Sequence, residues 1–304
     1  MLNRNRSVVA YTPVRLIASA TKRLPTVWLL LIATLYILLG LFDRAPWKTD
    51  DVIGLATMLS ALNEGHIAWL IPHIGSTTLT QNGPLPMWVG AAFMWMLEPL
   101  ISHIAAARVA VIFWFAIMLW ALWYGTYLLG RRNEGQPLAL PFGGEPTPRA
   151  YGRLLADVSA LFLMATVGVL LRLHETSEAP TLMAIQALIL LGAIRMLDKP
   201  FQGSMLIGVA LGGAFLTRGL PAALPLVIGL IIVLLPRNPM YGRKKWVVWS
   251  VSLGFAISVA WLYLAQQADS AWADEWWHWN SSLLGLGGVH DIFRPLRDLP
   301  WFIW

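Results

Sequence analysis

The chain has 304 residues, of which 57% are hydrophobic and 12% are charged, and it contains 17 Trp. Soluble domains average about 25% charged residues, so this composition excludes an ordinary water-soluble protein. The net charge of +6 is typical of a membrane protein that keeps Lys and Arg in its cytoplasmic loops, and it is not taken as a sign of nucleic-acid binding. The absence of Cys excludes disulfides, thiolate metal sites and Cys nucleophiles.

The N-terminal region predicts an uncleaved signal anchor. The first 25 residues carry five basic residues and no acidic one, and the apolar run that follows lacks a small-residue cleavage site. We therefore expect a first membrane span at residues 26–42, with the N-terminus in the cytoplasm.

Further apolar runs are long enough to approach the roughly 17–25 residues that a membrane-spanning helix needs. A polar segment rich in Pro and Gly, residues 131–153, separates the second run from the third and predicts a loop. The sequence therefore predicts an all-α, polytopic transmembrane bundle, with later spans at 103–130, 154–171, 179–196, 203–216, 220–235 and 246–266. The final residues read as the start of another span.

The run at residues 84–100 is ambiguous, because its length fits either a span or a helix lying in the membrane interface. If it is interfacial, most basic residues fall on the cytoplasmic side, in four groups within 4–23, 131–153, 195–199 and 237–245. Most acidic residues then fall on the outer side. We therefore predict that residues 43–102 form an outer loop with interfacial helices, and that residues 103–304 hold the remaining spans.

The stretch "TDDVIGLATMLSALNEG" predicts a short amphipathic helix in this outer loop. Thr49 or Asp50 is suited to be its N-cap, and Gly65 is suited to end it. One apolar stripe at helical spacing is formed by Val52, Leu55, Leu59 and Leu62.

Asp50 and Asp51 stand at the start of this helix, just past the first span. On one interpretation Asp50 caps the helix and Asp51 complements its dipole. On the other, a carboxylate serves as a general base or a metal ligand at the membrane face. The residue pattern alone leaves both interpretations open.

Several short motifs, in order along the chain, resemble those of the polyprenyl-phosphate-sugar-dependent glycosyltransferases of the GT-C fold. This family includes the aminoarabinose transferase of lipid A and the protein O-mannosyltransferases. The acidic pair of "WKTDD" resembles the pair that follows the family's first span. The other similar stretches are "QNGPLPMW" in the outer loop, "HETSEAPTLM", "FLTRGLPAALPLVIG" and "FRPLRDLPWFIW".

The resemblance implies a membrane enzyme that transfers a sugar from a polyprenyl-phosphate donor to a lipid or protein acceptor. It implies an active site on the outer face of the cytoplasmic (inner) membrane. Asp50 matches the family's catalytic acidic residue and Asp51 its acidic neighbour. The resemblance implies substrate binding by Asn82, Glu178, Arg218 and Arg294.

Glu178 and Arg218 also have a structural interpretation. Ser177 is suited to cap the next helix with Glu178 in its first turn, and Arg218 is suited to extend to lipid headgroups. His278, within "DEWWHWN", is a weak candidate metal ligand, since a lone His among Trp residues is more often structural.

The sequence departs from the family pattern at two places. The aminoarabinose enzymes carry an acidic and a basic residue before the Pro that corresponds to Pro84, whereas Gln81, Asn82 and Gly83 stand here. No Arg follows the acidic pair. A divalent metal is therefore left open, and we expect the family's C-terminal soluble domain to be missing from this chain.

Two other functions compete with sugar transfer. A lipid-linked-sugar transporter would carry inverted repeats and ionisable groups near the middle of its spans, and neither is evident, since Asp157 and Arg172 fall near span ends. A non-catalytic membrane subunit would not depend on Asp50.

Overall fold

The computed structural model describes residues 15–42, 44–234 and 242–282, and this part of the chain is almost entirely helical. The helices are α1 (Thr26–Leu38), α2 (Thr49–Asn63), α3 (His66–Leu70), α4 (Pro84–Leu97), α5 (His103–Gly130), α6 (Pro148–Ala165), α7 (Val167–Leu173), α8 (Ala179–Asp198), α9 (Pro200–Arg218), α10 (Leu220–Val233), α11 (Lys244–Ala268) and α12 (Ser270–Ser282). Short elements complete the fold: the 3-10 helices η1 (Ala18–Thr21) and η2 (Asn133–Gly135), and the two-residue strands β1 (His73–Ile74) and β2 (Thr77–Thr78).

Four of the described helices, α5, α8, α9 and α11, are long and apolar enough to cross a membrane. The bent pair of α6 and α7 would make a fifth span. The protein is therefore a multi-pass membrane protein, and the predicted all-α bundle is confirmed.

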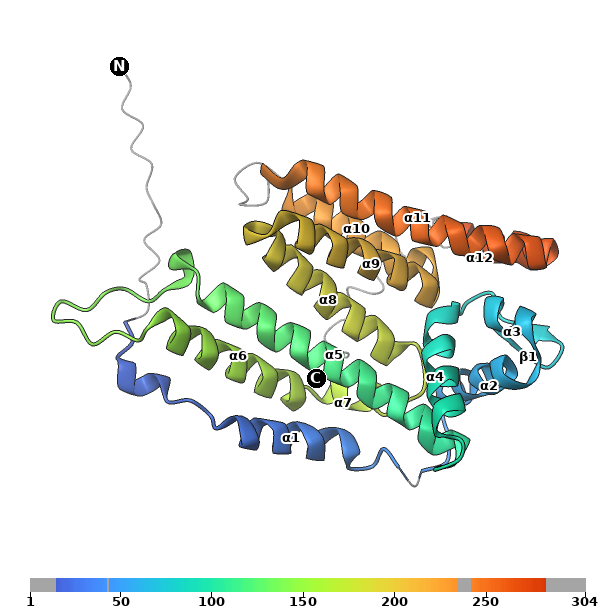
Figure 1. The fold of residues 1–304 in the computed structure, drawn as a ribbon, viewed down its shortest axis with the longest axis horizontal. Coiled ribbons are helices and arrows are strands. Elements are labelled where there is room, and N and C mark those ends of the chain that lie inside the picture. Colours follow the sequence, from blue (N-terminus) through green and yellow to red (C-terminus); the bar gives the residue numbers. More distant parts are fainter. Residues whose placement is uncertain (1–14, 43, 235–241, 283–304) are drawn as a thin grey trace, which may run out of the picture.

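The bundle is built around α5, α8, α9 and α11 (Figure 1). Helix α5 packs against α6 and α8, α8 packs against α9, and α9 packs against α11. Small residues let α8 and α9 approach closely: a Cβ atom on Gly203 would lie 2.4 Å from the backbone nitrogen of Met196. Close backbone approach at Gly is the usual way in which helices associate in lipid, where burial of apolar surface drives association weakly.

The first predicted span differs from the helix that the structure contains. Helix α1 has 13 residues and its C-cap is Leu39, whereas the prediction extended to residue 42. At 1.5 Å per residue it is about 20 Å long, which is less than the roughly 30 Å of a hydrocarbon core. Gly40, with φ of 78°, follows directly and turns the chain out of the helix.

The segment predicted as a span at 154–171 is not one straight helix, because it breaks at Thr166. Helices α6 and α7 meet there at an angle of 71°. The Thr166 backbone has an extended conformation, with ψ of 109°, and its hydroxyl donates to the carbonyl oxygen of Phe162 at 2.9 Å. No Pro or charged residue marks this break in the sequence. The break redirects the end of the segment toward α2, where Arg172 pairs with Asp50.

The segment between α1 and α5 gathers at one end of the bundle (Figure 1). Helix α4 has 14 residues and packs against α2 and α5. At about 21 Å it is short for a span, which agrees with the interfacial placement predicted for this segment. Indole N–H groups of the last two helices hold the loop in place: Trp261 donates to the carbonyl of Leu70 at 3.1 Å, and Trp272 to that of Leu79 at 3.4 Å.

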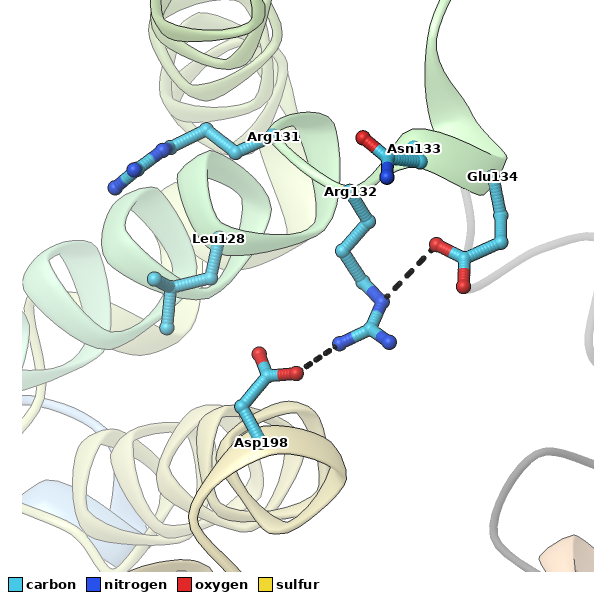
Figure 2. Close-up of a pocket in the computed structure, with 6 residues that line it drawn as sticks. All are labelled: Leu128, Arg131, Arg132, Asn133, Glu134 and Asp198. Atoms are coloured by element: carbon cyan, nitrogen blue, oxygen red, sulfur yellow. Dashed lines mark hydrogen bonds and ion pairs between the residues drawn. The ribbon is translucent and has the colours of Figure 1, made fainter.

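The segments predicted to be cytoplasmic meet at the opposite end. Arg132 contacts Asp198 at 2.6 Å, and Arg243 donates to the carbonyl of Leu197 at 2.8 Å. Figure 2 shows Arg132 pointing toward Asp198 and Glu134 in a polar cavity of about 390 Å³, with Arg131 turned away from them. The two predicted sides thus correspond to two separate ends of the fold.

Candidate functional site

Asp50 and Asp51 lie in the first turn of α2, and Lys48 is the N-cap. The expectation that Thr49 or Asp50 caps this helix is therefore wrong. The helix begins at Thr49, one residue earlier than a cap at Thr49 would allow, and the Lys48 side chain makes no capping hydrogen bond. Both carboxylates still lie where a helix N-terminus favours negative charge.

Asp51 is completely buried and is held by two partners distant in sequence. Arg108 of α5 donates to both carboxylate oxygens, at 2.9 Å each. The backbone N–H and the hydroxyl of Thr176 both donate to Oδ1 at 2.7 Å. Bidentate Arg–carboxylate pairs are among the strongest side-chain hydrogen bonds, so Asp51 fixes α2 against the bundle.

Burial by itself would raise the pKa of the Asp51 carboxyl group, because it disfavours the charged form. The hydrogen bonds from Arg108 and Thr176 outweigh burial and hold the pKa below its ordinary value. Asp51 is therefore a carboxylate at neutral pH, and all its close contacts are already used by the protein.

A glycine allows α2 to approach the segment between α7 and α8. A Cβ atom on Gly54 would lie 1.8 Å from the carbonyl oxygen of Thr176. No side chain fits in that space, so the contact depends on Gly at this position. This close approach is what allows Asp51 to reach Thr176.

Asp50, the neighbour of Asp51, faces outward, and its side chain is 57% exposed. Its ion-pair partner is Arg172 of α7, at 3.6 Å between Oδ2 and Nη1. The break at Thr166 is what brings α7, and with it Arg172, to the start of α2. Unlike Asp51, Asp50 is open to a ligand.

Two further ion pairs surround the acidic pair. Lys48 pairs with Glu175, whose side chain is 1% exposed, and Arg172 lies 3.5 Å from the other oxygen of that carboxylate. Arg44 donates to the carbonyl of His174 at 2.8 Å and lies 4.0 Å from Asp51. We call the seven ionised side chains at this end the acidic-pair cluster: Arg44, Lys48, Asp50, Asp51, Arg108, Arg172 and Glu175.

The structure brings three of the predicted substrate-binding residues together. Glu178 forms an ion pair with Arg218 at the end of α9, and it accepts a hydrogen bond from the Asn82 side chain at 3.4 Å. The sequence predicted that Glu178 lies in the first turn of α8. In the structure Glu178 is instead the N-cap residue, immediately before the helix. Ser177 does accept the backbone N–H of Ala179, at 3.3 Å.

The loop that carries Asn82 is fixed by its neighbour Gly83. The Gly83 N–H donates to the carbonyl of Thr217 at 2.9 Å, and a Cβ atom at this position would lie 2.1 Å from the carbonyl oxygen of Leu216. The turn after α9 is equally constrained: Gly219 has φ of 65°, and Asn280 accepts the N–H of Leu220 at 2.9 Å. Arg218 is thus held between two rigid turns.

An apolar cavity of about 400 Å³ opens beside this turn, between α9, α10, α11 and α12. Phe215 and Leu220, on either side of Arg218 in sequence, line it. Apart from Ser258, its lining residues carry no polar functional group other than the Trp277 indole N–H. Such a surface suits a hydrocarbon chain.

One predicted site residue, His278, takes no part in this arrangement, and another falls where the structure describes nothing. Arg294 lies outside the described residues. His278 is exposed on α12, and within residues 15–42, 44–234 and 242–282 no group of three or more His, Cys, Asp or Glu side chains is arranged to hold a metal ion. The described residues therefore do not fit a divalent metal, and no step below depends on one.

Arg108, Thr176 and Glu175 were not among the predicted site residues, although Glu175 and Thr176 lie within the quoted motif "HETSEAPTLM". Arg108 stands within an apolar run and its partner is 57 residues away. Arg172 looked like a span-end residue that extends to headgroups, whereas it faces Asp50. The one available signal was that several ionisable residues of an otherwise apolar chain fall in two short stretches, 44–51 and 172–178.

No family model matches this chain, and no curated protein matches its sequence. Its structure is similar to the crystal structure of ArnT from Cupriavidus metallidurans bound to undecaprenyl phosphate, with a TM-score of 0.63 and 19% sequence identity. The similarity covers 84% of this chain and 44% of that one, so the chain spans less than half of ArnT. The expected GT-C arrangement is therefore confirmed at the level of the fold: this chain has the fold of the corresponding part of an ArnT.

Proposed function

We propose that this protein transfers a sugar from a polyprenyl-phosphate donor to a hydroxyl group of a lipid or protein acceptor, at the outer face of the cytoplasmic membrane. The observation that carries the proposal is the contrast between the two carboxylates of α2. Asp51 is fully buried and bound by Arg108 and Thr176, while Asp50 is open at the helix start. One carboxylate builds the site, and the other is exposed, with one long ion pair to Arg172.

Asp50 acts as the general base that accepts the proton of the acceptor hydroxyl. Asp51 has a positioning role, because it locks the first turn of α2 against α5. The similarity of the fold to an ArnT bound to undecaprenyl phosphate supports a lipid-phosphate donor. A long lipid presents its headgroup only at the membrane surface, which is where an interfacial helix such as α2 would lie.

The second group of residues supports the same donor. Arg218 provides a guanidinium group for a phosphate, and Asn82 and Glu178 provide hydrogen-bonding groups for sugar hydroxyls. The apolar cavity next to Arg218 is suited to the first isoprene units of the lipid. Arg294, by its position in the motif, remains a further proposed phosphate ligand.

The test is sugar transfer in membranes that contain this chain, supplied with polyprenyl-phosphate sugars. Asp50→Asn should lower the rate by about 100-fold or more, the usual contribution of a general base. Asp274→Asn, which changes an exposed carboxylate on α12, is the matched control and should keep full activity. If Asp50→Asn transferred sugar as fast as the wild type, the assignment of the base would be wrong.

A further inference from the structure

We propose that Arg172 binds the phosphate of the donor, and that its move from Asp50 to that phosphate frees Asp50 to act as the base. This inference rests on the proposed function. It names a phosphate-binding residue that was not among the substrate-binding residues predicted from the sequence motifs.

Arg172 is the loosely held cation of the acidic-pair cluster. Its Nη1 atom lies 3.6 Å from Asp50 and 3.5 Å from Glu175, and its side chain is 52% exposed. Neither contact reaches the 2.7–2.9 Å that charge-assisted hydrogen bonds usually have. By contrast, Arg108 is 1% exposed and makes two hydrogen bonds of 2.9 Å to Asp51.

The position of Arg172 also suits a phosphate shared with Arg218. Arg172 contacts Glu175, and Arg218 contacts Glu178, three residues further along the same segment. Three residues span at most about 11 Å, so the two guanidinium groups flank one short stretch of chain. A phosphate lying over residues 175–178 would be within reach of both long side chains.

The formal charges of the cluster balance the donor and the product alike. Four cationic side chains face three carboxylates, which leaves one positive charge. The phosphodiester of a lipid-linked sugar carries one negative charge. The lipid phosphate left after transfer is a monoester, which carries close to two negative charges at neutral pH. The phosphate thus gains about one negative charge, and the cluster gains one positive charge when Asp50 takes up the proton.

The transfer step conserves atoms and electrons. The acceptor oxygen forms a bond to the anomeric carbon, and the bond between that carbon and the phosphate oxygen breaks, with its electron pair passing to the phosphate. The hydroxyl proton goes to Asp50. Arg172, now on the phosphate, neutralises the charge that develops there, and nothing is oxidised or reduced.

The experiment measures equilibrium binding of undecaprenyl phosphate to the purified full chain in phosphatidylcholine nanodiscs, with undecaprenol as the uncharged control ligand. Arg172→Gln should weaken binding of the phosphate about 10- to 100-fold, as expected for loss of a charge-assisted hydrogen bond, and leave undecaprenol binding unchanged. Arg172→Lys should restore most of the affinity. Arg149→Gln, an exposed Arg at the start of α6 at the other end of the bundle, should have no effect.

A double-mutant comparison tests the exchange itself. Asp50→Asn releases Arg172, so it should tighten phosphate binding about two- to fivefold, the range measured for exposed ion pairs. In the Arg172→Gln background the same change should have no effect. If Arg172 had only a structural role, the effect of Asp50→Asn on phosphate binding would not depend on Arg172. Thermal unfolding of each variant is the control that checks whether the fold is retained.

The outcomes separate this inference from the proposed function. If Arg172→Gln weakens phosphate binding but the wild type transfers no sugar, the proposed function fails, and with it the role of Asp50 as base, while the assignment of Arg172 as a phosphate-binding residue holds. If the wild type transfers sugar while Arg172→Gln leaves the donor KM and the phosphate affinity unchanged, the inference fails and the proposed function stands. Absence of undecaprenyl phosphate binding by the wild type would overturn the inference.

Discussion

Arg108 and Asp51 form a buried, bidentate ion pair that joins α5 to α2, with side chains 1% and 0% exposed. The pair connects the first long helix of the bundle to the helix that carries Asp50. Because Arg108 also donates to the carbonyl of His174 at 2.9 Å, the same guanidinium group fixes the segment before α8. Three parts of the chain thus depend on one side chain.

Removing either partner should destabilise the protein strongly. Arg108→Gln or Asp51→Asn leaves a buried charge without its partner, which typically costs about 3–5 kcal/mol. The double variant should lose less than the sum of the two, with a coupling energy of about 0.5–3 kcal/mol. Unfolding in sodium dodecyl sulfate, followed by Trp fluorescence, measures these values, and additive losses would show that the pair is not coupled.

Acid should act on stability through Asp51. The pKa of its carboxyl group is lowered in the folded state from an ordinary value of 3.8. Above that value both folded and unfolded states carry the charge, and the stabilisation is fully present. As the pH falls below 3.8, the unfolded state takes up the proton first, so the stabilisation is lost progressively until the pH passes the lower folded pKa.

The measurement is the unfolding midpoint as a function of pH for the wild type and for Asp51→Asn. The wild type should lose stability more steeply on the acid side of 3.8, and the difference between the two proteins should shrink there. Contributions of the other carboxylates cancel in this difference. Parallel curves would show that Asp51 keeps an ordinary pKa in the folded protein.

The long helices were predictable, whereas the break that shapes the site was not. The predominantly apolar runs at 103–130 and 179–196 correspond to α5 and α8 to within two residues. The run at 154–171 looked equally continuous, yet the chain bends at Thr166. The local sequence has little preference there, and the contacts of α7 with the rest of the protein decide its direction.

Individual site residues were predictable where a motif marked them. Asn82, Glu178 and Arg218 were selected from three separate stretches, and they do meet. The contact between Asp51 and Thr176 could not be inferred, because Thr176 lies 125 residues away and one of its two donors to the carboxylate is the backbone N–H. A backbone donor leaves no trace in the residue types of a sequence.

Gly54→Ala should destabilise the protein, against the usual trend for this substitution. In a helix interior, Gly→Ala normally adds about 0.5–1 kcal/mol of stability. Here the new methyl group would meet the carbonyl oxygen of Thr176, and overpacking typically costs about 1–3 kcal/mol. Gly229→Ala in α10 is the matched control, since a Cβ atom there meets nothing within 4 Å.

The readout is the rate of limited proteolysis within the loop between α1 and α4, together with the unfolding midpoint. Gly54→Ala should speed cleavage and lower the midpoint, and Gly229→Ala should do neither. If both variants gained stability alike, α2 would not pack against residues 174–178 as the structure shows.

Asn280→Ala should weaken donor binding indirectly, because Asn280 supports the turn that follows Arg218 and is not itself a proposed donor ligand. Asn280 is fully buried, and it accepts the N–H of Leu220 and donates to the carbonyl of Trp276 at 3.0 Å. Its loss leaves the backbone N–H of Leu220 without this acceptor, at a cost of about 1–3 kcal/mol, and loosens the turn that follows Arg218. We expect a higher KM for the lipid-linked sugar with a nearly unchanged kcat, because Asp50 lies on another helix. Ser282→Ala, an exposed residue on α12, should change neither constant, and a selective fall in kcat would instead place Asn280 near the reacting atoms.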